Sequence, residues 1–212
     1  MKIFDISVPI KNKMVVWPGD PQVKNIEVSS ISNGGEANIT YLQMSAHTGT
    51  HIDAPKHFID DGRSIDQLDL HLLIGDVHVI EIDDLVKLID EKVLEELKID
   101  HWPKRVLFKT ANSTSKLLDK DDFIQDYVAL SKDASQFLIK CGVKLVGIDY
   151  LSIAPFENGD ETHTALLSND IIILEGLKLS KIEPGLYQMV ALPINLFGAD
   201  GAPARVVLTQ ND

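Results

Sequence analysis

Three observations predict the fold class of this chain, an α/β domain with a mixed, barrel-like β-sheet flanked by helices. Short apolar runs rich in β-branched residues recur along the whole chain. Two amphipathic helical patterns interrupt these runs, and several of the expected strands are far apart in sequence. No repeat, low-complexity tract or change of composition marks a linker, so a single domain over residues 1–212 is expected.

Strands are expected wherever a short apolar run is bounded by polar or turn-forming residues. The run Pro-Gly-Asp-Pro at residues 18–21 and the polar segment at 29–36 are read as loops between them. The expected strands lie at residues 2–9, 39–46, 77–82, 105–109, 143–149, 171–174, 187–192 and 204–208.

Two helices and one helical turn are expected between these strands. Residues 83–97 place five apolar side chains at helical spacing with charges opposite them. Residues 131–140 open with Ser131, a favoured capping residue, and end before Gly142. A short helical turn is expected over residues 163–167.

Composition excludes several classes of partner. The chain has 20 basic and 32 acidic residues, a net charge of −12, so a nucleic acid or an anionic membrane surface is not an expected partner. Cys141 is the only cysteine, which forbids an internal disulfide and favours a reducing cytoplasm. No signal peptide or transmembrane helix is expected, because no apolar stretch approaches the necessary length.

A cluster of histidines and an aspartate at residues 45–58 has the composition of a metal site. His47, His51 and Asp53 alternate with apolar or β-branched residues, which predicts an extended segment with its ligands on one side. Two residues four apart in a straight strand are separated by roughly 13 Å, too far to share one ion. A bend at Gly49 is therefore expected, since glycine tolerates the backbone angles required.

A second stretch carries His163 and, twelve residues later, Glu175. Mixed imidazole and carboxylate donors suit a divalent cation, with zinc expected first and manganese as the alternative. His57 lies beyond Pro55 and is the expected proton carrier, because the pKa of a histidine is ordinarily near 6.5. A lone histidine at a strand end is more often structural; the clustering favours ligands here. The remaining histidines have no partner pattern.

The run His-Thr-Gly-Thr-His-Ile-Asp-Ala-Pro-Lys-His at residues 47–57 resembles the signature of the metal-dependent cyclase family, which includes bacterial kynurenine formamidase and isatin hydrolase. The resemblance covers essentially the full chain. Further segments that resemble the family lie at residues 5–7, 16–20, 147–149, 163–167, 175–177, 191–193 and 202–208.

This resemblance implies a swivelling β/β/α-type fold and a two-metal site. One ion would be held by His47, His51 and Asp53, and Asp53 would bridge to a second ion. The second ion would be held by His163 and Glu175. In such proteins a residue at the position of His57 acts as acid and base.

Trp17 resembles a position where the family contacts an aromatic substrate, although a core aromatic is an equal alternative. The resemblance also implies a homo-oligomer, a dimer or tetramer.

The function implied is hydrolysis of a carbon–nitrogen bond other than a peptide bond in a small aromatic amide. The expected reaction is that of an arylformamidase, which converts N-formylkynurenine to kynurenine and formate with a metal-activated water and His57. One alternative is a hydrolase of a cyclic amide such as isatin or of another small carbonyl substrate, since a pocket rather than a fold sets the substrate. Another alternative is a catalytically silent metal-binding module.

Overall fold

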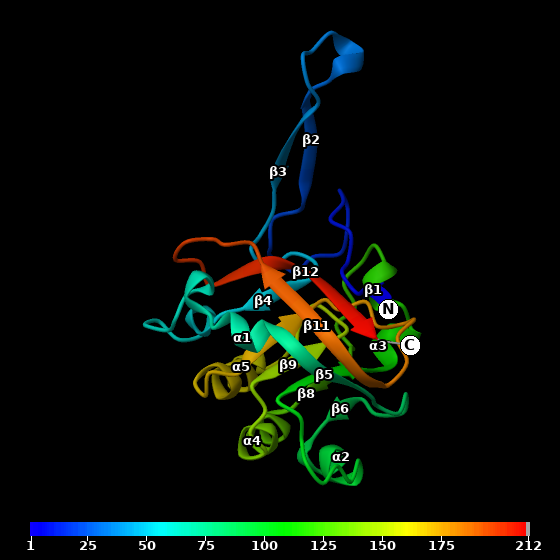
Figure 1. Ribbon diagram of the computed structural model, residues 1–212, viewed down its shortest axis with the longest axis vertical. Helices are drawn as coiled ribbons and strands as arrows, with labels where there is room; N and C mark the ends of the chain where they lie inside the picture. Colours follow the sequence, from blue (N-terminus) through cyan, green and yellow to red (C-terminus); the bar gives the residue numbers. More distant parts are fainter. Residues whose placement is uncertain (211–212) are drawn as a thin grey trace.

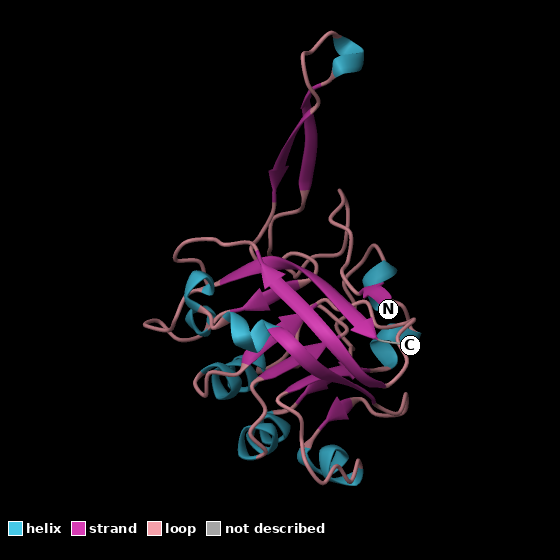
Figure 2. Ribbon diagram, in the orientation of Figure 1, coloured by secondary structure: helices cyan, strands magenta, loops and turns pink. Residues whose placement is uncertain are grey.

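The computed structural model describes residues 1–210, and its centre is a closed, mixed β-barrel (Figures 1 and 2). Seven strands form the ring, because the strand at His51–Asp53 pairs on one side with Ile172–Glu175 and on the other with Gly201–Gln210, which closes the sheet. The order is β12 (Gly201–Gln210), β11 (Gly185–Pro193), β5 (Ile74–Glu81), β7 (Arg105–Lys109), β9 (Leu145–Ile148), β10 (Ile172–Glu175) and β4 (His51–Asp53). An eighth strand, β1 (Lys2–Asp5), pairs with the end of β12 beyond the segment that contacts β4. The predicted mixed, barrel-like α/β fold is confirmed.

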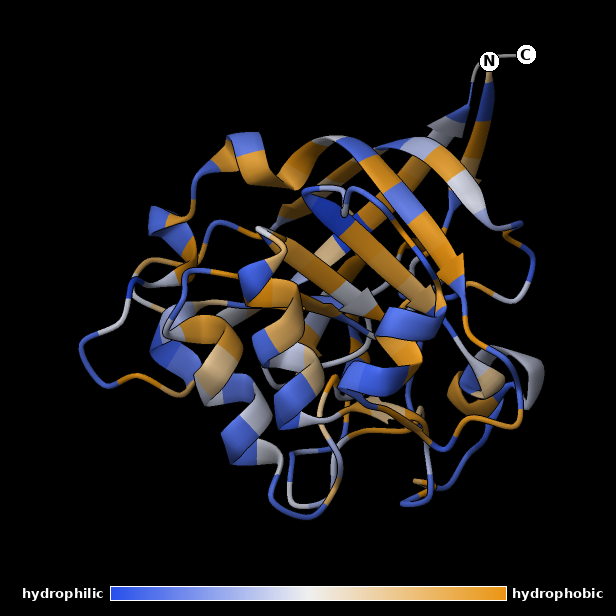
Figure 3. Ribbon diagram, turned by 90° about the horizontal axis from the view of Figure 1, so that it is seen from below, coloured by the Kyte–Doolittle hydropathy of each residue, from blue (hydrophilic) through white to orange (hydrophobic). Residues whose placement is uncertain are grey.

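Two apolar cores lie on the two faces of the barrel wall, as the period of two in a strand requires. Leu107 and Leu145 point into the barrel, whereas Val106 and Val146 point outward. Helices α2 (Glu91–Glu96), α4 (Lys132–Lys140) and α5 (Gly159–Leu167) supply apolar side chains to the outer core. Figure 3 shows barrel strands dominated by hydrophobic residues and helices that carry both kinds.

The predicted helix over residues 131–140 is confirmed: the hydroxyl of Ser131 accepts a hydrogen bond from the backbone of Ala134 (3.3 Å). The turn predicted at 163–167 is the end of the longer helix α5. The prediction of one helix over residues 83–97 is wrong. This stretch contains the short strand β6 (Leu88–Ile89) and then α2, because Asp90 caps the new helix by accepting from Val93 N.

All predicted strands are present, although most of their bounds differ from the prediction. The first two end early, at Asp5 and at Gln43, the end of β3 (Ile39–Gln43). Strand β2 (Lys24–Ser29) was not predicted. The remaining α-helices and strands are α1 (Leu70–Leu73), α3 (Ala111–Thr114) and β8 (Ala129–Leu130), the last paired with β6. Among the described residues, no helix has the length and apolar character needed to cross a membrane.

Strands β2 and β3 form a separate hairpin that projects from the barrel (Figure 1). The segment predicted as a loop at residues 29–36 is its tip. The extended segment expected to lead to His51 is interrupted, because β3 ends at Gln43 and turns follow. Leu42 lies on this hairpin with 47% of its surface exposed.

Two glycines, Gly49 and Gly176, bring β4 and the end of β10 together. Both have a positive φ, +68° at Gly49 and +69° at Gly176, which a side chain disfavours. A Cβ at residue 176 would collide with the carbonyl oxygen of Gly49. The hydroxyl of Thr50 also donates to the Gly176 carbonyl (2.6 Å), so the two turns are locked to each other.

A Gly176→Ala substitution should therefore lower the free energy of unfolding by about 3 kcal/mol, from left-handed strain plus a steric clash. Gly142→Ala is the matched control, since Gly142 has a φ of +78° but no atom within 4 Å of a Cβ. It should cost only about 1 kcal/mol. Urea unfolding of both variants measures this, and equal losses would contradict the proposed clash.

Candidate metal centre

The centre of the site is the antiparallel pair of strands β4 and β10. Glu175 lies directly opposite His51, and Asp53 lies opposite Ile173. Directly opposite side chains on one face lie about 5 Å apart. Ile52 and Leu174 point into the barrel, so His51, Asp53 and Glu175 share the outer face. All three are buried: their residues are 1%, 0% and 3% exposed.

His47 joins this group from the turn before β4. The backbone bends at Gly49, as predicted, and brings His47 Nδ1 to 2.8 Å from Asp53 Oδ1. The prediction of one extended segment that carries these ligands on one side needs correction. His47 is in a turn, and His51 and Asp53 are covered by the loops and helix above them.

His163 reaches the same place from α5. Its Nε2 lies 3.3 Å from Glu175 Oε1 and 3.8 Å from Asp53 Oδ2. The structure thus brings together all five residues predicted as ligands, although the two stretches are more than a hundred positions apart. Their roles as ligands stay a prediction.

Backbone carbonyls fix the orientation of two of the imidazoles. His51 Nδ1 lies 3.0 Å from the carbonyl oxygen of Gly49, and His163 Nδ1 lies 2.8 Å from that of Gly159. A carbonyl can only accept, so each Nδ1 carries a proton. Nε2 of each ring then faces the carboxylates, which is the usual arrangement of a metal-binding histidine.

Asp53 supplies the most direct sign that a cation fits here. Its Oδ2 is buried and has no hydrogen-bond partner. Two sets of donor atoms lie within 4.8 Å of one another, His51 with Asp53 and Glu175, and His47 with Asp53 and His57. Asp53 belongs to both sets, and their imidazole and carboxylate donors suit a divalent metal.

Burial and mutual contact shift the pKa values of these groups strongly. Burial disfavours the charged form of His51, but Asp53 and Glu175 outweigh this effect and raise its pKa to about 10. Burial likewise opposes protonation of His163, yet Glu175 raises its pKa. Burial alone would raise the pKa of Asp53, whereas hydrogen bonds from His47 and His51 hold it well below its usual range.

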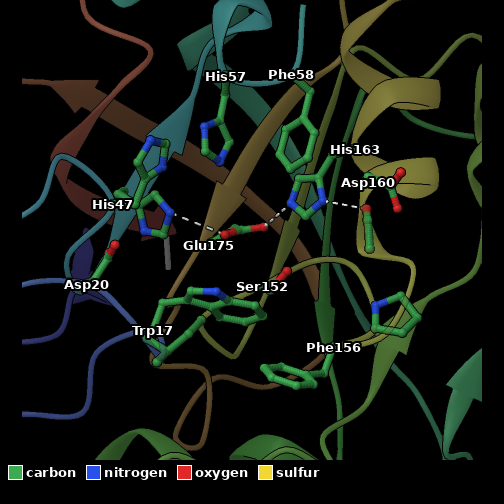
Figure 4. Close-up of a pocket in the computed structure, with 14 residues that line it drawn as sticks. Trp17, Asp20, His47, His57, Phe58, Ser152, Phe156, Asp160, His163 and Glu175 are labelled. Atoms are coloured by element: carbon green, nitrogen blue, oxygen red, sulfur yellow. Dashed lines mark hydrogen bonds and ion pairs between the residues drawn. The ribbon is translucent and has the colours of Figure 1, made fainter.

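A cavity of about 280 Å³ opens beside the cluster (Figure 4). Its wall opposite His57 is aromatic: the rings of Trp17 and Phe156 have centroids 5.4 Å apart. Phe58 stacks on His163 with centroids 4.4 Å apart. Trp17 also packs against Phe123, so it is both a cavity residue and part of an aromatic cluster.

His57 stacks on His47 and borders the cavity, with ring centroids 3.9 Å apart. Burial lowers the pKa of His57, whereas contacts with carboxylates outweigh burial and raise the pKa values of His47, His51 and His163. Asp200 contacts both rings, with Oδ2 3.1 Å from His47 Nε2 and 3.3 Å from His57 Nδ1. Sequence reasoning missed Asp200, because nothing near it in the sequence signals that β12 begins beside the histidines.

The chain matches the family model described as "Putative cyclase" over residues 4–155. It is 40% identical over 219 residues to Cyclase-like protein 3 of Oryza sativa subsp. japonica, covering 99% of this chain and 80% of the relative. It is 36% identical over 208 residues to kynurenine formamidase of Bacillus anthracis, covering 98% of this chain and 97% of the relative.

A solved structure described as a potential metal-dependent hydrolase with cyclase activity superposes with a TM-score of 0.85. The two chains are 33% identical, with 100% of this chain and 98% of the other covered. Together with the family match over most of the sequence, these likenesses identify the chain as a member of the cyclase family of metal-dependent enzymes.

Proposed function

We propose that this protein is a metal-dependent amide hydrolase that cleaves aryl formamides and that its substrate is N-formylkynurenine. We also propose that residues 1–212 form a single domain. The observation that carries the proposal is a buried cluster of histidines and carboxylates at the base of an aromatic-walled cavity, in which Asp53 Oδ2 has no hydrogen-bond partner. The near full-length likeness to a Bacillus kynurenine formamidase supports the choice of substrate.

We further propose that two ions occupy the cluster, zinc in preference to manganese, with Asp53 shared between them. His47 and His51 would complete one site, and His163 and Glu175 the other. When bound, such ions supply Lewis-acid activation of water and of the substrate carbonyl. A reducing cytoplasm is the proposed location, supported by the single cysteine.

The side chains around the cluster have the other proposed roles, which are packing of the substrate, orientation of His57 and delivery of a proton. Trp17 and Phe156 offer ring faces against which the aryl group packs. Asp200 lies beside Nδ1 of His57 and holds that ring, leaving Nε2 without a partner among the described residues. When the carbon–nitrogen bond breaks, the departing aniline nitrogen needs a proton, and His57 is the group proposed to deliver it.

Hydrolysis of N-formylkynurenine and of isatin by the zinc- and manganese-loaded protein, followed by absorbance, tests the substrate proposal. Cleavage of isatin alone would replace the formamide substrate with a cyclic amide. Activity that survives complete removal of metal by a chelator would contradict the proposed chemistry.

The role of His57 makes a separate prediction. A His57→Ala variant should retain its metal but lose roughly 100-fold or more in kcat, the usual contribution of a general acid–base group. His101→Ala removes an exposed imidazole outside the cavity and should leave kcat unchanged. Mass spectrometry of the metal content separates the alternatives: loss of metal from His57→Ala would make His57 a ligand.

Metal binding should release protons, because the raised pKa of His51, about 10, keeps it protonated in the metal-free protein at neutral pH. Calorimetry of metal binding in two buffers of different ionisation enthalpy measures this release. Affinity should increase with pH. Proton release near zero would contradict the protonated metal-free site.

The same pKa shift sets the pH dependence of stability. The folded pKa of His51 lies above its ordinary value of 6.5, so its stabilising effect is complete below pH 6.5 and is lost as pH rises toward 10. The Tm of the metal-free protein should therefore fall across this window, and the metal-loaded protein should not share this fall.

We also propose that the protein forms a homo-oligomer, a dimer or tetramer, through the β2–β3 hairpin. Ile26 and Tyr41 face each other on one side of the hairpin, and they are 45% and 51% exposed. Ile39 lies on the same face as Tyr41 and is 53% exposed. A projecting two-stranded hairpin with an uncovered apolar face is marginal on its own and fits an interface.

Tyr41→Lys should convert the oligomer to monomers, since it places a charge on the apolar face of the hairpin. Thr40→Lys introduces the same group on the opposite face and should leave the oligomer intact. Light scattering coupled to size exclusion gives the mass of each. A wild-type monomer would contradict the proposal.

A further inference from the structure

Ser152 places a hydroxyl group in the wall of the cavity, beside the ligand cluster. The residue is only 4% exposed, and it lines the cavity. The backbone N–H of the next residue, Ile153, donates to Glu175 Oε1 (2.6 Å). Ser152 is therefore held next to a proposed metal ligand, and Figure 4 shows its oxygen between Glu175 and the ring of Phe156.

The hydroxyl of Ser152 has a proton that it can offer to a substrate. Its oxygen accepts a hydrogen bond from the backbone N–H of Ala154 (3.2 Å), which occupies one lone pair and orients the side chain. Tyr127 lies nearby: burial raises the pKa of its phenol, and the Ser152 hydroxyl partly offsets that rise. The phenol donates its own proton to the Ala154 carbonyl (2.7 Å). The Ser152 proton can therefore turn toward the Tyr127 oxygen or into the cavity, because a hydroxyl proton rotates about its C–O bond.

A buried hydroxyl in an apolar part of the wall discriminates between ligands. The side chains of Leu151 and Pro155 line the cavity on either side of Ser152 in the sequence, and neither can form a hydrogen bond. An apolar group in front of Ser152 would displace water without replacing its hydrogen bond, whereas a carbonyl oxygen would replace it. The cavity therefore favours a ligand with an acceptor at this point.

The position of Ser152 corresponds to one part of an aryl formamide. The formyl group must lie at the ligand cluster, where the proposed cleavage takes place, and the ring packs against Trp17 and Phe156. The amide nitrogen and the ring carbons nearest to it lie between these two parts of the substrate. A substituent ortho to the nitrogen therefore comes next to a hydroxyl that lies between the cluster and the aromatic rings.

Resting on the proposed function, we propose that Ser152 is a specificity-determining residue that donates a hydrogen bond to a carbonyl group ortho to the formamide nitrogen. This contact narrows the substrate class to aryl formamides that carry an ortho-acyl group. N-formylkynurenine belongs to this class, because its ketone is attached to the ring carbon next to the one that bears the formamide.

Two formanilides with the same reacting bond test this inference on the metal-loaded protein. One carries an ortho-acetyl group. The other carries an ortho-isopropenyl group, which has nearly the same shape but a methylene in place of the carbonyl oxygen. The ratio of their kcat/KM values should exceed the ratio of their rates of hydroxide-catalysed hydrolysis by about 10-fold, within the range for one hydrogen bond. Division by the hydroxide ratio removes the intrinsic difference in reactivity.

Ser152→Ala should reduce this excess to below about threefold, because it removes the donor. Ser135→Ala is the matched control and should retain the full excess. It also removes a buried hydroxyl, but one on α4 that donates to the Ser131 carbonyl (3.0 Å) and lies outside the cavity lining. The measurement on the wild type tests the inference by itself if Ser152→Ala does not fold.

The outcomes separate this inference from the function on which it rests. A wild-type ratio equal to the hydroxide ratio, with both compounds cleaved, would overturn the role of Ser152 and leave the hydrolase intact. An excess that persists in Ser152→Ala would also overturn it, since a purely structural serine, or one bonded to the shared formamide group, would affect both compounds equally. Hydrolysis of neither compound would contradict the proposed function as well.

Discussion

The burial of two carboxylates on adjacent strands is the constraint on which the rest of the site depends. Asp53 and Glu175 have almost no solvent exposure and share one face of the barrel wall. Buried like charges are costly unless cations compensate them. Among the described residues, the groups that ion-pair with them are imidazoles rather than lysine or arginine. A protonated imidazole can compensate these charges, and it can also release its proton to solvent and bind a metal through the freed nitrogen. The same side chains would therefore stabilise the carboxylates with or without a metal ion.

The barrel fixes this arrangement through strand register. His51 and Asp53 face outward because Ile52 fills the barrel core, and a slip of one residue would exchange the two faces. The locked turns at Gly49 and Gly176 oppose such a slip from one end. The helix that carries His163 packs on the outer core and closes the site from the other side.

The sequence allowed the fold class, most of the strands and all five clustered ligand candidates to be predicted, because each rests on local chemistry. Period-two apolar runs indicate strands, and histidines beside an aspartate indicate a metal site. The helix predicted over residues 83–97 failed, since apolar spacing does not reveal that Ile89 is needed in a strand beside Leu130. Asp200 could not be found for a similar reason: its value comes from β12 lying next to β4, which is a property of the closed barrel.

Exposure differs across the cluster in a way that separates two tasks. The side chains of His51 and Asp53 are 2% and 1% exposed, whereas that of His57 is 29% exposed and that of its neighbour Asp200 is 46% exposed. Groups that hold a cation benefit from exclusion of water, because water competes with them and weakens their electrostatic interactions. A group that carries a proton must exchange it with solvent between turnovers. His57, the proposed proton carrier, is buried enough for its pKa to be lowered and exposed enough to exchange a proton with solvent, and Asp200 would stabilise the proton on its ring. Solvent exposure thus increases from the buried carboxylates to His57. This difference argues for a catalytic site rather than a closed structural metal site, in which all donors would be equally buried.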